Sequence, residues 1–241
     1  MEIQWLGHAC FRITHRGYSV VIDPYDSDYV TGYPKLQNVK ADKLLISHES
    51  YGHNYRRGVV LSGRPEADCP FAITTMEVWH DTVCGIMRGS CLVHVLETDG
   101  IRVAHMGDIG APLTGEQERL LFDLDAIMVT AGSCTALPSQ EVWRMMEELY
   151  PKVILPMHYR DGARGPRRLE HLEEFTKYFA PDMIRFFDTD RITITHGMEP
   201  QIAVLKFIGH QEEKNTAERS TLWRSSLASK VATKFRSTRR T

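Results

Sequence analysis

The sequence lacks the features that mark membrane and secreted proteins. No uninterrupted apolar stretch approaches the roughly 18 residues that a membrane-spanning helix requires. Met1 leads directly into polar and aromatic residues, so we expect no secretory signal. The five cysteines are odd in number and form no CxxC pair, which favours reduced thiols over a disulfide framework or a zinc ribbon. These absences predict an intracellular, cytoplasmic protein.

The composition is that of an ordinary globular protein, but its charge is unevenly distributed. Apolar residues make up 42% of the 241 residues and charged residues 25%, which is enough for a buried core. Residues 214–241 hold eight Lys and Arg against one acid, Glu218, so this segment is near +7. The total of −2 then leaves about −9 on the rest of the chain. An acidic body argues against nucleic acid at the main site.

Short β-type runs are spread along most of the chain, and helical patterns are confined to its second half. The runs carry Val or Ile and are bounded by Gly, Pro, Asp or Asn. They are 2–5, 10–14, 19–23, 44–47, 72–75, 92–97, 101–106, 126–130, 153–156, 184–187, 192–195 and 202–207. A β-rich first half followed by alternating strands and helices predicts an α/β sandwich with its helices outside.

Three segments have the spacing of amphipathic helices. Thr114 is placed to cap a helix over Gly115–Phe122, and Ser139 to cap one over Gln140–Tyr150. Arg167–Phe179 has apolar residues at helical spacing. All three follow predicted strands, as expected for helices that cover a sheet.

The basic tail has a helical pattern of its own. Four apolar side chains recur every four residues among Arg and Lys: Trp223, Leu227, Val231 and Phe235. This pattern predicts a basic amphipathic helix, which could dock on the acidic body, contact a partner subunit or touch an anionic membrane surface. We therefore divide the chain into a globular domain, residues 1–210, and a basic tail, residues 211–241.

Side chains that bind metals lie just beyond the ends of several predicted strands. They are His48, His53, His80, Asp108 and His158. In layered α/β folds, the carboxyl ends of strands meet at one edge, where loops build a site. A single histidine in such a place is commonly a hydrogen-bonded loop residue, so the prediction depends on the repetition. Imidazoles with a carboxylate suit zinc, manganese or iron.

Five sequence segments resemble a known family. They are Trp5-Leu6-Gly7-His8-Ala9, Val21-Ile22-Asp23-Pro24, Leu45-Ile46-Ser47-His48, His105-Met106-Gly107-Asp108-Ile109-Gly110 and Leu155-Pro156-Met157-His158-Tyr159. Together they resemble the metallo-β-lactamase-fold hydrolases, in particular the bacterial subgroup that includes L-ascorbate-6-phosphate lactonase. The resemblance covers about residues 1–207. It implies an αββα sandwich of two mixed β-sheets flanked by helices, with a metal site at one edge of the sheets.

The resemblance also implies a metal site that has lost two ligands. Against the family motif His-x-His-x-Asp-His, His48 and His53 match the first and last positions. Ser50 stands where the second histidine belongs, and Gly52 where the aspartate belongs. Neither residue replaces an imidazole or a carboxylate well, so the affinity for metal is expected to fall.

The remaining family ligands are present. His80 resembles the next ligand, Asp108 the carboxylate that bridges two metals, and His158 the final histidine. One position would keep His48, His80 and a share of Asp108, and the other would keep His53, His158 and Asp108. We expect at most one well-occupied zinc or manganese ion, held mainly by His53, Asp108 and His158, which are also the expected catalytic residues.

Other polar residues near these motifs are expected to support the ligands. His8 in the Gly-His-Ala turn is one, and Asp23 before Pro24 is another, although a plain turn residue is an equal interpretation of Asp23. Carboxylates often hold ligand imidazoles in one tautomer, and Asp23 or Asp81 could do so.

Two functions remain open from the sequence. The first is a metal-dependent hydrolase that acts on a lactone, ester or phosphoester of a small polar metabolite. The second is a non-catalytic descendant that uses the pocket to bind a metabolite or a protein partner. A homo-oligomer is compatible with either function.

Overall fold

The computed structural model describes residues 1–132 and 135–209. The chain divides into two units, Met1–Ile208 and Gly209–Thr241. The amphipathic helix predicted in the basic tail lies outside the described residues, so it stays a prediction, as does the domain boundary at residue 210. Within the described part of the chain, no helix is long and apolar enough to cross a membrane.

Twelve strands form two mixed sheets. The five-stranded sheet has the order β13-β1-β2-β3-β5, in which β3 and β5 are parallel and the other pairs antiparallel. Its strands are β13 (Arg191–Thr193), β1 (Glu2–Gly7), β2 (Cys10–His15), β3 (Tyr18–Ile22) and β5 (Lys43–Leu45). Strand β13 comes from late in the chain and pairs with β1 in the register Ile3–Ile192. The first and last thirds of the domain are therefore joined in one sheet.

The second sheet has seven strands in the order β12-β14-β11-β10-β9-β8-β7. They are β12 (Ile184–Phe186), β14 (Gln201–Val204), β11 (Val153–Met157), β10 (Ala126–Thr130), β9 (Ile101–His105), β8 (Ser90–Thr98) and β7 (Ala72–Trp79). The pairs from β12 to β9 are parallel, and β8 is antiparallel to both β9 and β7. Strands β7, β9, β10 and β11 consequently end at the same edge of the sheet.

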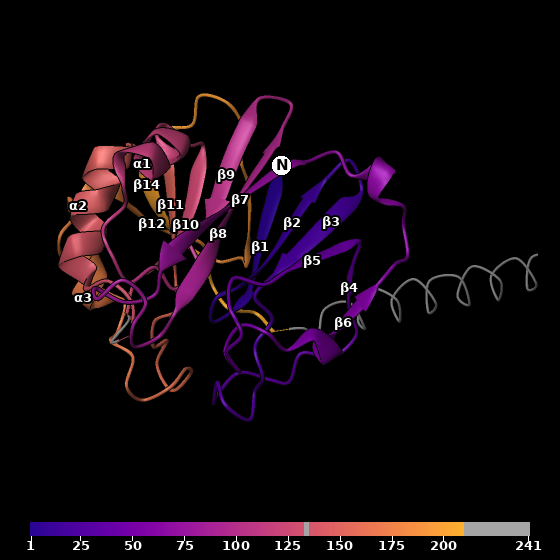
Figure 1. Cartoon of the computed structure of the whole chain (residues 1–241), viewed down its shortest axis with the longest axis horizontal. Helices are drawn as coiled ribbons and strands as arrows, with labels where there is room; N and C mark the ends of the chain where they lie inside the picture. Colours follow the sequence, from indigo (N-terminus) through magenta and orange to yellow (C-terminus); the bar gives the residue numbers. More distant parts are fainter. Residues whose placement is uncertain (133–134, 210–241) are drawn as a thin grey trace, which may run out of the picture. The chain divides into compact units, whose positions relative to one another are not determined.

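The helices lie on the outer side of the seven-stranded sheet (Figure 1). They are α1 (Gly115–Leu121), α2 (Ser139–Leu149) and the short α3 (Glu173–Thr176). Every residue of β10 and β11 is buried, because α2 packs on one side of these strands and the first sheet on the other. Strands covered on both faces need continuous apolar runs, as Ala126–Thr130 supplies.

Smaller elements complete the unit. The pair β4 (Val39–Ala41) and β6 (Val59–Leu61) lies next to β3 and β5. Three 3₁₀ helices are η1 (Arg56–Gly58), η2 (Glu66–Asp68) and η3 (Pro181–Met183). Buried side chains of both large sheets form one continuous core. The structure confirms the predicted α/β sandwich of two mixed sheets.

Two of the helix predictions need correction. Thr114 caps α1 with the expected capping box, in which Gln117 is the partner. Pro138, however, is the N-cap residue of α2, and the Ser139 hydroxyl donates to the carbonyl of Ala131 instead. The helix predicted over 167–179 shrinks to α3, because bonds such as Arg160 N to Glu170 O hold the preceding residues in an irregular loop. Strands β4 and β6 were not predicted.

Candidate metal centre

Four of the five residues predicted to bind metal are histidines that converge on a carboxylate oxygen of the fifth, Asp108. The Asp108 Oδ2 atom lies 3.4 Å from His53 Nε2, 3.5 Å from His158 Nε2, 3.6 Å from His80 Nε2 and 4.0 Å from His48 Nε2. His48, His80 and His158 follow strands β5, β7 and β11, respectively. Asp108 lies three residues beyond β9. The site therefore lies where the ends of both sheets meet. Such a convergence of ligand-type side chains from separate strands is what a metal centre requires.

Glycines let the Asp108 loop approach the loops around it. Gly107 has φ +55, and a Cβ atom there would lie 2.9 Å from the Cβ of Ser47. A Cβ atom at Gly110 would lie 2.3 Å from the carbonyl of His80, a contact that no side chain permits. The Gly-Asp-Ile-Gly sequence thus brings Asp108 close to the chain that carries His80.

Asp23 contacts Ser47 and His53 on the side of the His53 ring that faces away from Asp108. Its carboxylate accepts from Ser47 N at 2.6 Å and from the Ser47 hydroxyl at 2.5 Å, and it lies 2.8 Å from His53 Nδ1. Because Nδ1 of His53 faces Asp23, its Nε2 is left to face Asp108. Asp23 therefore holds the imidazole of a predicted ligand, as expected from the sequence.

Asp81 has a different role from the one predicted. Instead of holding an imidazole, its carboxylate accepts backbone N–H bonds from four residues of the following loop: Val83, Gly85, Met87 and Arg88. It therefore shapes the loop after His80.

The electrostatics of the site favour a cation. Burial opposes a charge on Asp108, but His158 and His53 lower the pKa of its carboxyl well below the usual value. Burial likewise opposes ionisation of Asp23, yet His53 lowers its pKa to about 2. For His53, burial works against the charge, while Asp108 and Asp23 raise the pKa to about 10. Asp23 and Asp108 are therefore ionised on opposite sides of the His53 ring, and a metal that binds His53 Nε2 would replace the proton there.

Burial keeps three other imidazoles of the cluster neutral, those of His48, His158 and His8. Burial, aided by the neighbouring His53, lowers the pKa of His48 to about 4. Burial also lowers the pKa of His158 to about 4, against the pull of Asp108. Burial and His158 lower the pKa of His8 well below its ordinary value. Neutral imidazoles keep the lone pair that a metal ligand needs.

Several buried atoms in the cluster have no hydrogen-bond partner. Among the described residues they are His8 Nδ1, His80 Nε2, His158 Nδ1 and Asp108 Oδ1. Buried polar atoms are normally paired, because leaving them unpaired costs free energy. A cation at this point would satisfy His80 Nε2 and Asp108 Oδ1, so these residues fit a metal ion.

His8 lies closer to the centre than a supporting role requires. One ligand atom from each of His8, His53 and His158 can be chosen so that all three lie within 4.8 Å of one another, and His48, His53 and Asp108 form a second such group. His8 occupies the turn after β1, at the same edge as His48. Like His158, it directly follows a strand, but that position alone does not indicate which groups it faces.

The cluster opens into a cavity of about 280 Å³. The positions that lack family ligands, Ser50 and Gly52, line it together with the histidines. Arg88 and Arg168 also line it. The Arg168 guanidinium donates to the Tyr29 hydroxyl at 2.5 Å and lies over the Tyr29 ring. The cavity thus places two positive side chains near the clustered imidazoles.

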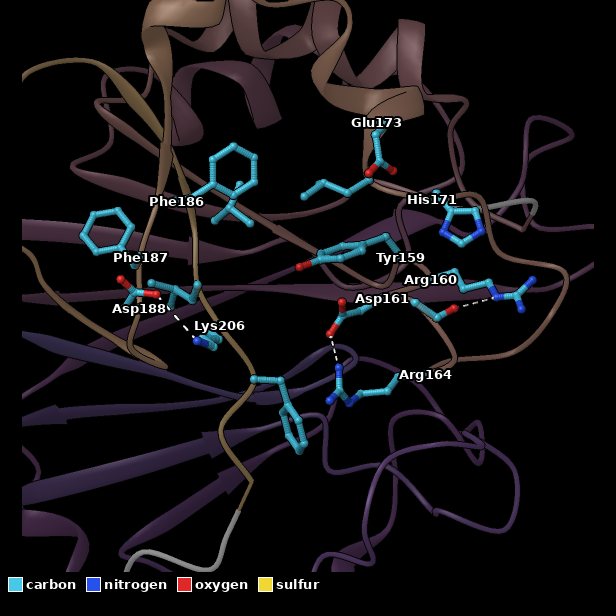
Figure 2. Close-up of a pocket in the computed structure, with 15 residues that line it drawn as sticks. Tyr159, Arg160, Asp161, Arg164, His171, Glu173, Phe186, Phe187, Asp188 and Lys206 are labelled. Atoms are coloured by element: carbon cyan, nitrogen blue, oxygen red, sulfur yellow. Dashed lines mark hydrogen bonds and ion pairs between the residues drawn. The ribbon is translucent and has the colours of Figure 1, made fainter.

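A second, larger cavity of about 490 Å³ lies between Phe186, Lys206 and the loop that follows Tyr159 (Figure 2). Its charged side chains are largely paired with near neighbours. Arg164 Nη1 lies 2.8 Å from Asp161 Oδ2, and Lys206 Nζ lies 3.5 Å from Asp188 Oδ1. This cavity shows no convergence of ligand-type atoms comparable to that around Asp108.

Comparison with known proteins agrees with this geometry. Residues 2–158 match the Beta-lactamase superfamily domain. The chain is 26% identical over 189 residues to a UPF0173 metal-dependent hydrolase of Pyrobaculum neutrophilum, covering 66% of this chain and 84% of that protein. A UPF0173 metal-dependent hydrolase of Archaeoglobus fulgidus is 25% identical over 198 residues, covering 66% and 83%.

A solved structure agrees as well. A metallo-β-lactamase superfamily protein of Thermotoga maritima superposes with a TM-score of 0.64 at 27% identity, covering 85% of this chain and 97% of that one. The match to the superfamily domain spans more than half of the chain and contains all five converging side chains. The chain therefore belongs to the β-lactamase superfamily and has the metallo-β-lactamase fold, as a relative of the UPF0173 metal-dependent hydrolases.

Proposed function

We propose that the protein is a metal-dependent hydrolase that acts on a lactone, ester or phosphoester of a small polar metabolite. The observation that carries this proposal is the convergence of four imidazoles on Asp108 Oδ2 inside a cavity. The UPF0173 relatives are named metal-dependent hydrolases, which supports the same activity. The finer resemblance to L-ascorbate-6-phosphate lactonase is part of this proposal and concerns the substrate class.

The residues that would hold a zinc or manganese ion are His53, Asp108 and His158, with His48 and His80 beside them. When bound, such an ion supplies a lowered pKa for a coordinated water and polarises the carbonyl or phosphoryl group of a substrate. Asp23 fixes the orientation of the His53 ring through Nδ1. The ionised Asp108 supplies the negative charge that makes a cation favourable in a buried place.

The cavity also suggests which part of a substrate it would hold. Arg88 and Arg168 line the cavity that contains the histidines. Arginine binds phosphate and carboxylate groups through paired N–H donors. We therefore favour a substrate that carries an anionic group beside the bond to be broken. The acidic balance of the body disfavours nucleic acid at this site.

The gaps at Ser50 and Gly52 favour a second candidate, a non-catalytic metabolite-binding protein. The missing aspartate of the family also orients the attacking water, as the resemblance implies. A metal analysis of protein purified without chelator, paired with a panel of lactones and phosphodiesters, separates the two functions. The hydrolase predicts close to one metal per chain and turnover that a chelator abolishes. A metal-free chain that binds a panel compound without cleaving it would establish the second candidate.

A further inference from the structure

We propose that His8 is a metal ligand in this chain, and that with His53 and His158 it forms a three-histidine site that replaces the aspartate missing at Gly52. The proposal deepens the proposed function, because it concerns the ligands of the same centre. It makes a chemical prediction of its own. Three imidazoles beside the Asp108 carboxylate are a nitrogen-rich ligand set that suits zinc better than manganese, so zinc should bind more tightly than manganese.

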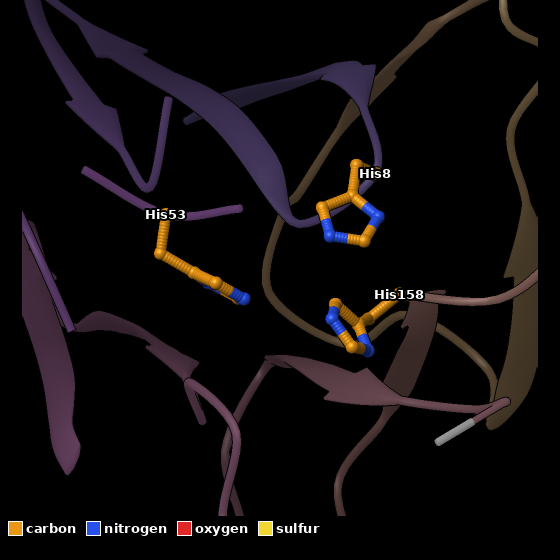
Figure 3. Close-up of side chains that lie close together, drawn as sticks. All are labelled: His8, His53 and His158. Atoms are coloured by element: carbon orange, nitrogen blue, oxygen red, sulfur yellow. The ribbon is translucent and has the colours of Figure 1, made fainter. Parts of the chain in front are cut away.

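The three histidines face a common space. Figure 3 shows their rings directed toward one another from three separate segments of the chain. The centroids of the His8 and His158 rings are 4.3 Å apart, and those of His53 and His158 are 5.3 Å apart. One nitrogen from each ring lies within 4.8 Å of the others. Zinc bonds of about 2.0–2.1 Å bring nitrogens to about 3.3 Å apart, so the rings need only a modest inward movement.

The absence of a side chain at Gly52 is what leaves room for His8. A Cβ atom at Gly52 would lie 3.2 Å from His8 Nε2, the nearest atom to that position. The imidazole therefore occupies the space into which an aspartate at this position would project. The glycine that removes the family's aspartate is therefore also the residue that lets His8 approach the centre.

The backbone holds His8 beside His158. Its carbonyl accepts from His158 N at 3.2 Å and from Trp5 Nε1 at 3.0 Å. Both histidines have left-handed backbone conformations, with φ 54. Residues other than glycine adopt such conformations only where the surrounding structure favours them, and they are common at functional sites.

The two rings are buried and present the same nitrogen to the common space. His8 is 1% exposed and His158 is 6% exposed. Nε2 of His158 lies 3.5 Å from Asp108 Oδ2, and Nε2 of His8 is the atom nearest to the Cβ position of Gly52. A metal bound between the rings would therefore be held through Nε2 of both histidines.

The test is the coordination of zinc and cobalt in the full-length protein and in His8→Ala. With one equivalent of zinc, X-ray absorption should show three imidazoles in the natural protein and two in the variant. The zinc affinity, measured against a competing chelator, should fall by about a hundredfold. The visible spectrum of the cobalt form should change in shape. His94→Ala is the matched control, because it removes a buried histidine outside the cluster and should leave all three readouts unchanged.

A rescue experiment keeps the proposal testable if His8→Ala is poorly folded. Adding Gly52→Asp to His8→Ala should restore zinc affinity, because the aspartate can then enter the space that the imidazole filled. Gly52→Ala alone should weaken zinc binding by pushing His8 aside. Zinc bound with equal affinity and the same imidazole count in His8→Ala would overturn the proposal and leave the hydrolase intact. A natural protein that binds no zinc would instead overturn the proposed function.

Discussion

The two cavities described in the domain differ in how their polar side chains are paired, and the larger volume does not identify the functional cavity. The larger, about 490 Å³, is lined by charged side chains that pair with one another, such as Arg164 with Asp161. The smaller, about 280 Å³, contains buried atoms of His8, His80, Asp108 and His158 that have no partner. Ligand-type side chains that converge in a buried place can hold a ligand, whereas paired charges at the surface contribute little to stability. We therefore propose the smaller cavity as the functional one.

The largest difference between the two cavities is expected from a substitution of Asp108. Asp108→Asn should reduce zinc affinity by at least about a hundredfold, since the binding energy of about 10–16 kcal/mol is shared among about four ligands. Asp161→Asn in the larger cavity is the matched control and should bind zinc normally. Metal content per chain and chelator competition measure both. Equal zinc binding by the two variants would remove the distinction between the cavities.

A substitution of Asp23 tests whether metal binding in the smaller cavity depends on the contact between Asp23 and His53. Asp23→Asn removes the charge that holds His53 and weakens two bonds to Ser47. We expect the metal affinity to fall about tenfold to a hundredfold. The free energy of unfolding should also fall by about 3 kcal/mol, because a buried ion pair is broken. Zinc titration and urea unfolding measure the two effects, and unchanged metal affinity would show that His53 does not need this partner.

Restoring the two missing family ligands should increase the metal affinity of the smaller cavity. Ser50→His with Gly52→Asp supplies both missing side chains, but the new aspartate would lie against His8. We expect tighter zinc or manganese binding, by about tenfold, once His8→Ala is added to make room. Hydrolysis of model esters should rise with it. A folded triple variant whose metal affinity does not rise above that of His8→Ala would show that the loop differs from the family in shape as well as in side chains.

The smallest effect is expected in the larger cavity. Arg164→Ala removes a partly exposed ion pair with Asp161, and such pairs contribute up to about 1 kcal/mol to stability. Metal content and activity should not change. Thermal unfolding together with metal analysis would check this, and a loss of activity without a loss of stability would make the larger cavity a second functional region.

Much of the fold is predictable because its signals are local. The buried strands Ala126–Thr130 and Val153–Met157 are continuous apolar runs, and Thr114 with Gln117 forms a complete capping box. Ser139 fails as a cap because its hydroxyl finds a distant partner in Ala131. The helix predicted after Arg167 is reduced to α3 because bridges within the loop from Arg160 to His171 compete with it. Contacts between distant residues thus override the local pattern.

The sequence by itself determined which side chains could form a metal centre, since His48, His53, His80, Asp108 and His158 follow strands whose ends share an edge. Only the tertiary structure decided where His8 belongs. A turn after the first strand carries no signal of what faces it, and the space beside Gly52 exists only after the loop from β5 packs against that turn. Spacing along the chain fixes which residues lie at an edge, whereas the distances between ligand atoms depend on how separate loops pack there.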